Sequence, residues 1–150
     1  MNAPIRKLKI LFLCTGNSCR SQMAEGWAKA LKPDLVQAYS AGVEPKAVDP
    51  RAVRAMAEAG VDISGQWAKD VAELGDIQFD WVVTLCDHAR ESCPLFPGRV
   101  QRLHMGFADP PFLAQDAGSE EEAMDHYRRV RDEIKAFVAG LPASLQAKEE

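Results

Sequence analysis

The sequence predicts an α/β fold, a three-layer sandwich in which a four-stranded parallel sheet carries helices on both faces. Short apolar runs alternate along the chain with helical patterns, which favours a parallel sheet with crossover helices. The runs are nearly continuous in apolar residues, as is typical of strands buried on both faces. The chain has 150 residues, 47% of them apolar, and this length and composition indicate one domain with a hydrophobic core over 1–150.

The first half of the chain supplies two strands and two helices. Leu8–Leu13 predicts a buried strand, and Ser21–Leu31 predicts a helix that ends before a Lys-Pro-Asp sequence. Residues 35–40 predict the second strand. A second helix is expected to begin after Asp49, which suits an N-cap and is followed by proline, and to end at Gly60.

The middle of the chain contains the other two strands. Residues 62–74 are ambiguous, and we expect a short helix after Ser64-Gly65. Asp80–Cys86 is the clearest buried strand in the sequence, and Val100–Met105 predicts a fourth. Because ligands bind at the carboxyl ends of strands in such sheets, side chains that end these strands are candidates for a shared site.

The last predicted element is a long helix. Ser119 and Glu122 match a capping box that would open it. Its apolar stripe consists of Met124, Tyr127, Val130, Ile134, Phe137, Val138 and Leu141. After this stripe we expect residues 143–150 to form a polar tail that frays.

Charge and hydropathy exclude several classes of protein. There are 18 Lys and Arg residues against 22 Asp and Glu, a net charge of −4 with no basic arm, so nucleic-acid binding is not indicated. The apolar runs are too short to span a membrane, and the polar N-terminus has no signal-peptide core. We therefore expect a cytoplasmic monomer. Four cysteines in a reducing compartment point to catalysis, redox cycling or metal binding rather than static disulfides.

The most informative motif is the Cys-x5-Arg loop from Cys14 to Arg20, between the first strand and the first helix. A thiolate is a good nucleophile, and a helix N-terminus with Arg20 is expected to lower the pKa of Cys14. Gly16 lets backbone amides converge on an anion, and a guanidinium can grip two of its oxygens. The predicted oxyanion-binding residues are Thr15, Gly16, Asn17, Ser18, Cys19, Arg20 and Ser21. The alternative is an ordinary strand-to-helix turn. For Cys19 itself, packing is favoured over catalysis.

A second cysteine pair, Cys86 and Cys93, follows the third predicted strand. A rigid helix rises about 1.5 Å per residue, whereas a disulfide needs Cα atoms within about 7 Å, so we predict that the segment between them rearranges on oxidation. Two alternatives stay open. The pair can be inert, or it can bind zinc with His88, although that spacing fits no common zinc pattern.

Asp109 is the candidate general acid. It precedes two prolines, which bias it towards an extended conformation and stiffen its loop, and a carboxylic acid there could protonate a leaving oxygen. The alternative is an ordinary Asp-Pro turn.

The stretch from Cys14 to Gly26, Cys-Thr-Gly-Asn-Ser-Cys-Arg-Ser-Gln-Met-Ala-Glu-Gly, resembles the low-molecular-weight tyrosine phosphatase superfamily, and within it the thioredoxin-coupled arsenate reductases. The phosphatase branch has proline where this chain has Gln22. Three further stretches fit the resemblance, which runs from about Lys9 to Leu141: Tyr39-Ser40-Ala41-Gly42, Thr84-Leu85-Cys86 through Cys93-Pro94, and Phe107-Ala108-Asp109-Pro110-Pro111. The resemblance also implies the four-stranded parallel sheet.

The resemblance implies a reaction and a partner. Cys14 would attack arsenate held by the loop and Arg20, with Asp109 protonating the departing hydroxide. Cys86 would then release arsenite by forming a disulfide with Cys14, Cys93 would take over that disulfide, and thioredoxin would reduce it. Phosphate or sulfate would compete for the loop. No tightly bound cofactor is expected.

The resemblance also suggests a potassium site, because oxygen donors suit a hard cation. Its candidate ligands are Asn17, Glu25, Ser40 and Asp70. Two other functions remain open. One is a phosphomonoester or phosphotyrosine phosphatase using only Cys14, Arg20 and Asp109, and the other is a non-enzymatic redox or metalloid sensor.

Overall fold

The sheet is parallel throughout and has the strand order β2-β1-β3-β4. The computed structural model describes residues 6–94, 96 and 98–146, and within them the sheet has four strands, which confirms the predicted fold class. Their bounds are β1 (Leu8–Cys14), β2 (Val36–Gly42), β3 (Trp81–Thr84) and β4 (Gln101–His104). With β1 between β2 and β3, the chain crosses over β1 when it passes from β2 to β3, and this order is the doubly wound arrangement in which ligands bind at the carboxyl ends of β1 and β3.

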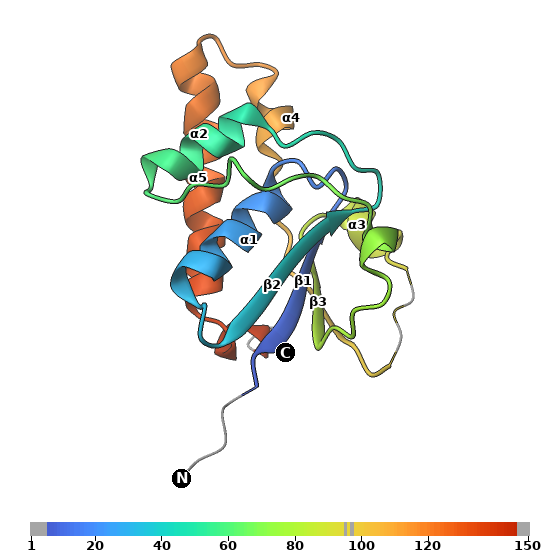
Figure 1. Cartoon of the computed structure of the whole chain (residues 1–150). Coiled ribbons are helices and arrows are strands. Elements are labelled where there is room, and N and C mark those ends of the chain that lie inside the picture. Colours follow the sequence, from blue (N-terminus) through green and yellow to red (C-terminus); the bar gives the residue numbers. More distant parts are fainter. Residues whose placement is uncertain (1–5, 95, 97, 147–150) are drawn as a thin grey trace.

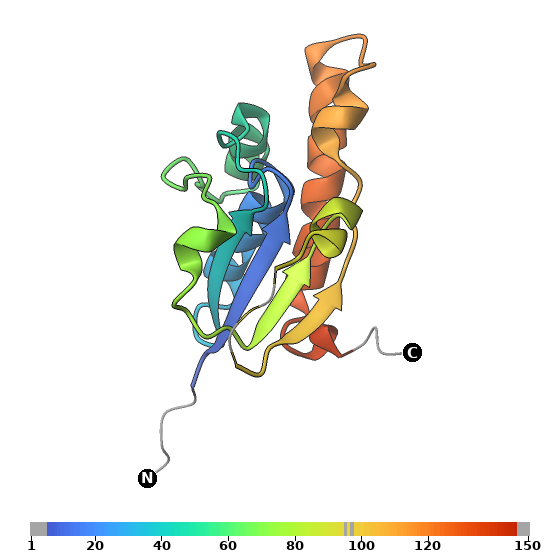
Figure 2. The same ribbon diagram turned by 90° about the vertical axis from the view of Figure 1, so that its right-hand side faces the viewer.

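Helices cover both faces of the sheet (Figures 1 and 2). One face carries α1 and α5, with α2 and α4 packed against α5. The other face carries a 3-10 helix, η1, and α3. A second 3-10 helix, η2, follows α5. Their bounds are α1 (Arg20–Leu31), α2 (Pro50–Glu58), η1 (Val71–Leu74), α3 (Asp87–Glu91), α4 (Pro110–Ala114), α5 (Glu120–Ala139) and η2 (Ala143–Leu145). No helix in the described part of the chain has the length and apolar character needed to cross a membrane.

The central strand explains the continuous apolar run. Successive side chains of a strand point to opposite faces, and in β1 both faces are covered. Ile10 and Phe12 lie in the core beneath α1 and α5, whereas Leu11 and Leu13 lie in the core beneath η1 and α3. All four side chains are fully buried. The last residue of β1, Cys14, is therefore held by the most buried strand of the sheet.

Two short helices were not predicted, and one was misplaced. The helices α3 and α4 have five residues each, too few for a helical period to show in the sequence. The helix expected after Ser64-Gly65 begins instead at Val71, because Asp70 caps it by accepting the N–H of Ala72 and forms a capping box with Glu73.

The C-terminal region is more ordered than predicted. Ser119 caps α5 by accepting the N–H of Glu122, and the whole predicted stripe is buried. The polar tail does not begin at residue 143, however. Leu145 in η2 is only 1% exposed and belongs to the core, so hydrophobic burial extends the domain past the proline. The predicted tail over 147–150 lies outside the described residues.

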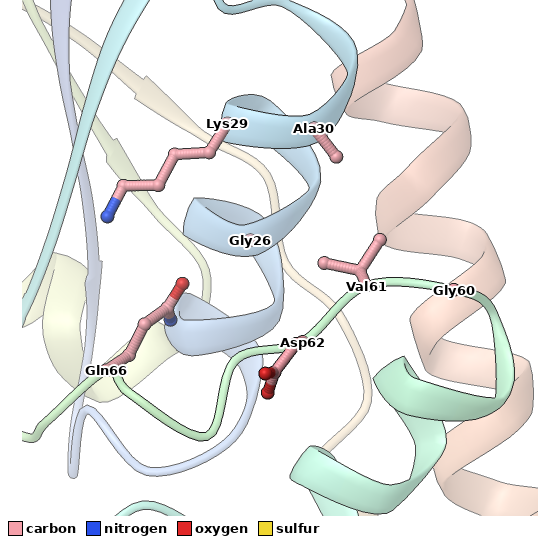
Figure 3. A pocket seen from close by; sticks show the side chains of 7 residues that line it. All are labelled: Gly26, Lys29, Ala30, Gly60, Val61, Asp62 and Gln66. Atoms are coloured by element: carbon pink, nitrogen blue, oxygen red, sulfur yellow. The ribbon is translucent and has the colours of Figure 1, made fainter.

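The segment 61–70 runs close along α1. A Cβ atom on Gly26 would lie 2.5 Å from Ile63 Cγ2, so glycine allows this approach. A shallow cavity of about 280 Å³ lies between them, and Figure 3 shows Lys29 of α1 and Gln66 of the segment on its walls. Trp67, in the same segment, is 63% exposed. The segment therefore reaches the N-terminal half of α1, which continues the oxyanion loop.

Candidate active site

The candidate active site lies at the carboxyl ends of β1 and β3. Cys14 ends β1, and Cys86 follows β3 by two residues. A backbone hydrogen bond from Leu85 N to Leu13 O (2.9 Å) continues the pairing of the two strands to this point. A cavity of about 320 Å³ opens beside Cys14. It is lined by Cys14, Thr15, Gly16, Ser18, Cys19, Arg20, Lys46, Asp49, Asp109 and Pro111.

The oxyanion loop, residues 14–20, has its carbonyl groups tied away from the cavity. The carbonyl oxygens of Thr15, Gly16 and Ser18 accept backbone N–H groups from the segment 43–49 at 2.8–2.9 Å. That of Asn17 accepts the side chain of Gln22 at 2.9 Å. With the carbonyl groups used in this way, the loop's N–H groups are left to converge on an anion, as the nest of a phosphate-binding loop does.

Asn17 fixes the shape of the loop. Its backbone is left-handed, with φ of 47°, a conformation that asparagine tolerates better than most residues. Its amide donates to Ser21 Oγ at 2.8 Å and to Ser40 Oγ at 3.0 Å. Its Oδ1 accepts the N–H of Lys69 at 2.9 Å. Because an N–H donor meets Oδ1, the orientation of the amide group is defined, and the loop is held rigid from three sides.

Gln22 is fully buried and holds the oxyanion loop through side-chain hydrogen bonds. Its Nε2 donates to Asn17 O and, at 3.0 Å, to Trp67 O. Its Oε1 accepts Gln66 Nε2 at 2.7 Å. A proline at this position has no side-chain donor, so the residue that separates this chain from the phosphatase pattern also ties the oxyanion loop to the segment 61–70.

Arg20 has a guanidinium group that is held on one side and carries a buried donor without a partner among the described residues. Its Nη1 donates to Phe107 O at 2.9 Å, and its Nη2 lies 3.6 Å from Asp109 Oδ1. Its Nε is buried and has no hydrogen-bond partner among the described residues. Buried donors in proteins are nearly always paired, so this free N–H indicates that the site is built to receive an acceptor such as an anion oxygen.

The thiols of Cys14 and Cys86 are hydrogen-bonded to each other and shift each other's pKa in opposite directions. This hydrogen bond is the main influence lowering the pKa of Cys86 to about 4, with further hydrogen bonds from Thr15 and the N–H of Ala89. The same hydrogen bond and burial raise the pKa of Cys14, although Arg20 lowers it. The expected low pKa of Cys14 is therefore not found, because the hydrogen bond with Cys86 and burial outweigh the lowering by Arg20.

Cys93 lies apart from this pair. Its Sγ accepts Arg102 Nη1 at 2.8 Å and lies 3.7 Å from Pro94 O. It lines a separate cavity of about 170 Å³ together with Arg90 and Arg102. Burial raises the pKa of Cys93, and Arg102 opposes that shift. All four cysteines are free thiols, and the predicted rearrangement of the segment between Cys86 and Cys93 stays a prediction.

Asp109 stands at the edge of the main cavity. It precedes α4 in an extended conformation, but its side chain makes no capping hydrogen bond. The side chain is 43% exposed, and its carboxyl group faces the guanidinium of Arg20 instead. A position between the cavity and solvent suits a group that delivers a proton to a bound ligand.

Cys19 packs as predicted. It is 4% exposed and lies in the core with α1 and α5. Burial, with the nearby charges of Asp49 and Asp109, raises its pKa well above the usual value. A buried thiol of this kind is a poor nucleophile, although its edge lines the cavity.

The structure brings together three of the four candidate potassium ligands. Asn17, Ser40 and Glu25 form one chain, in which Ser40 Oγ donates to Glu25 Oε1 at 2.5 Å. The Asp70 side chain caps η1. The oxygens of the cluster are already engaged by protein donors, so the residues present do not fit a potassium ion. The described residues contain no group of three or more His, Cys, Asp or Glu side chains arranged to hold a metal.

Several contacts escaped prediction from the sequence. Lys46 and Asp49 line the main cavity, and the only available signal was their position after β2, at the same edge of the sheet as Cys14. Tyr127 donates to Asp49 Oδ2 at 2.5 Å. Nothing in the sequence pairs Arg102 with Cys93, because the two are joined only when β4 lies beside β3.

Comparison with known proteins agrees with this geometry. Residues 9–150 match the family described as low molecular weight phosphotyrosine protein phosphatase. A protein of Halalkalibacterium halodurans named arsenate reductase is 50% identical over 130 residues, covering 87% of this chain and 91% of that protein. One of Bacillus subtilis with the same name is 53% identical over 126 residues, covering 83% and 88%. A solved structure described as an arsenate reductase in oxidized state superposes with a TM-score of 0.71 at 32% identity, covering 91% of this chain and 98% of that one.

The fold, the oxyanion loop and these relatives point the same way. The sheet order and the Cys-x5-Arg loop are those expected of the phosphatase superfamily, and the curated relatives at about half identity bear the name of a reductase. The chain belongs to the low molecular weight phosphotyrosine protein phosphatase family, on the branch whose curated members are named arsenate reductase.

Proposed function

We propose that this protein is an enzyme that reduces arsenate to arsenite through a relay of three cysteines regenerated by thioredoxin. The observation that supports this most is the hydrogen-bonded pair of Cys14 and Cys86 beside the free Nε of Arg20. A phosphatase needs one thiol at its anion site, whereas a reductase needs a second thiol within reach of the first. The pair meets that second requirement.

In the first step, arsenate binds to the N–H groups of the oxyanion loop and to Arg20. Cys14 passes its proton to the Cys86 thiolate and attacks arsenic, forming an S–As bond. One As–O bond breaks, and Asp109 supplies the proton with which that oxygen leaves as water. Preorganised donors at the anion oxygens stabilise the charge that builds up during this exchange.

In the second step, arsenic gains two electrons. Cys86 gives the proton that it took from Cys14 to an oxygen of the departing arsenite and, as a thiolate, attacks the sulfur of Cys14, so that an S–S bond forms while the S–As bond breaks. The electron pair of the S–As bond stays on arsenic, which leaves as arsenite, As(III). The two thiols are oxidised to one disulfide, so the electrons balance.

In the third step, the Cys93 thiolate attacks Cys86 and releases Cys14. This requires α3 to rearrange, because Cys93 is bound to Arg102 in the reduced protein. The resulting Cys86–Cys93 disulfide lies near the surface, where a thioredoxin dithiol can exchange with it. A reducing cytosol, which supplies thioredoxin, suits the chemistry, and a monomer suffices for it.

A coupled assay tests the proposal. The protein is mixed with arsenate, thioredoxin, thioredoxin reductase and NADPH, and loss of NADPH is followed. We expect arsenate-dependent turnover, and its absence would contradict the proposal. Cys93→Ser should complete one round, forming the Cys14–Cys86 disulfide, and then stop. Multiple turnovers by Cys93→Ser with thioredoxin would rule out the third step.

The phosphatase alternative is tested in parallel with p-nitrophenyl phosphate. It shares the oxyanion loop, Arg20 and Asp109, so weak hydrolysis is compatible with the proposal. A phosphatase as main function requires strong hydrolysis that Cys86→Ser leaves unchanged and no reduction of arsenate. Gln22 and the pairing of Cys86 with Cys14 favour the reductase.

A further inference from the structure

Lys69 places a positive charge beneath the oxyanion loop. Its side chain is 10% exposed, and its Nζ lies 3.9 Å from Oε1 of Glu25, whose side chain is 7% exposed. The ammonium group donates to Trp67 O at 2.9 Å and lies 4.9 Å from the centre of the Trp67 ring. Lysine is rarely buried to this extent unless it is paired. The burial of Lys69 therefore indicates that its ammonium group has a role beside Glu25.

A continuous chain of contacts leads from this ammonium group to the oxyanion loop. Glu25 accepts the hydroxyl of Ser40, and Ser40 accepts the amide of Asn17. The backbone N–H of Lys69 also donates to Asn17 Oδ1, so both ends of this chain of contacts belong to Lys69. Lys69 thus touches the left-handed residue of the loop directly through its backbone and indirectly through the Glu25 carboxylate.

A potassium ion would need the same oxygens. The Glu25 carboxylate already faces Lys69 and Lys29, which pairs with Oε2. Both Asn17 amide hydrogens point to serine hydroxyls, and its Oδ1 is taken. A further cation would stand beside two ammonium groups that share one carboxylate, and like charges at this range repel.

We propose that Lys69 is a tethered counter-ion that takes the place of a potassium ion: it neutralises Glu25 and, as a positioning residue, holds Asn17 and the oxyanion loop in the anion-binding conformation. The protein would consequently bind oxyanions equally well in potassium and in sodium. The inference rests on the anion site of the proposed function, but not on arsenate chemistry.

The test is calorimetric binding of inorganic phosphate to the whole protein in potassium chloride and in sodium chloride, at an equal ionic strength of about 0.1 M. The wild-type protein should give the same Kd in both salts. Lys69→Ala removes the ammonium group and leaves space, so phosphate binding should weaken by about tenfold in sodium. Potassium should then restore most of the loss and raise the melting temperature of this variant.

Two further variants sharpen the result. Lys69→Met removes the charge but fills the space, so its phosphate binding should be weak in both salts. Lys29→Met is the matched control: the Lys29 side chain is 55% exposed and its ammonium group pairs with the same carboxylate, yet the residue has no backbone hydrogen bond with Asn17. Its phosphate Kd should stay near the wild-type value and be indifferent to the salt.

Three results would overturn the inference. They are a wild-type protein whose phosphate affinity or melting temperature rises with potassium, a Lys69→Ala variant with wild-type affinity in sodium, and a weakened Lys69→Ala variant that potassium does not restore. If Lys69→Ala does not fold, two measurements remain: the phosphate Kd of the wild-type protein in the two salts, and the phosphate Kd of Lys69→Met. A Lys69→Met variant with wild-type affinity would then overturn the inference. The phosphate-binding test does not involve the reduction of arsenate. A protein that failed to reduce arsenate would therefore contradict the proposed function without affecting the inference about Lys69.

Discussion

Thr15 and Cys86 lie 71 positions apart in the chain, yet Oγ1 of the threonine is 3.1 Å from Sγ of the cysteine. The contact joins the residue after β1 to the connection after β3. It supplies a hydroxyl donor to the thiol whose pKa is lowered to about 4. The site therefore depends on the pairing of two strands as much as on the oxyanion loop.

We predict that Thr15→Val raises the pKa of Cys86 from about 4 by about one unit, since a hydrogen bond to the charged form lowers an acid's pKa. The thiolate disappears as pH falls through the pKa, so its absorbance at 240 nm should be lost at a higher pH in the variant. A Cys19→Ser, Cys93→Ser background isolates the pair.

Thr84→Val is the matched control, because the Thr84 hydroxyl bonds His104 rather than Cys86. Its thiolate titration should follow the parent's. An unchanged titration in Thr15→Val would show that the contact between Thr15 and Cys86 does not affect the pKa of Cys86.

Arg20→Lys should reduce kcat/KM for arsenate by roughly 10²- to 10³-fold. A lysine keeps the charge, but it cannot reproduce the guanidinium's fixed contacts with Phe107 O and Asp109 or its free Nε donor. Steady-state kinetics measure the loss. Arg54→Lys, on an exposed salt bridge of α2, should have little effect, and similar behaviour of the two variants would argue against anion binding by Arg20.

Gln22→Met keeps the volume of the buried side chain but removes its donor to Asn17 O and Trp67 O. The carbonyl group of Asn17 loses its side-chain partner, that of Trp67 keeps only the ammonium group of Lys69, and the loop becomes less rigid, so phosphate affinity should fall by about tenfold. The measurement is phosphate inhibition of p-nitrophenyl phosphate hydrolysis or calorimetry. The exposed Gln37→Met serves as the control, and equal phosphate constants for both variants would refute the role of Gln22.

Arg102→Gln should raise the pKa of Cys93, because the guanidinium opposes the effect of burial on that thiol. A smaller thiolate fraction at neutral pH slows thiol exchange. The variant should complete the first round at the wild-type rate but turn over more slowly with thioredoxin, and the deficit should shrink as pH rises. Arg90→Gln, which lines the same cavity, is the control. A slower first round in Arg102→Gln would contradict this assignment.

Leu145→Ala should lower the free energy of unfolding by about 2–4 kcal/mol, because Leu145 is 1% exposed in the core. Urea denaturation followed by circular dichroism gives the difference. Leu35→Ala, where the side chain is 37% exposed, should cost less. Equal losses would mean that η2 is not packed as described.

The sequence was sufficient for features that depend on neighbouring residues. The apolar run of β1, the Cys-x5-Arg loop and the Ser119 cap are local patterns, and each was found where predicted. The topology rule for parallel sheets also placed Cys14 and Cys86 at one edge.

Features that depend on distant contacts were not predictable. The pKa of Cys86 is lowered by hydrogen bonds with Cys14 and Thr15. Both residues reach Cys86 only because β1 pairs with β3. The role of Asp70 as a helix cap was hidden because η1 is only four residues long. The burial of Lys69 beside Glu25 depends on how the segment 61–70 lies along α1.

The β1–α1 and β3–β4 connections leave the same edge of the sheet from different strands, and each carries a different part of the proposed chemistry. The first holds the oxyanion loop, whose carbonyl groups are tied to the segment 43–49. The second carries Cys86, α3 and Cys93. The proposed division of labour therefore has one point of contact, where Cys86 meets Cys14 and Thr15. A substitution beyond Cys86 in the β3–β4 connection should alter the delivery of electrons while leaving the anion-binding loop in place.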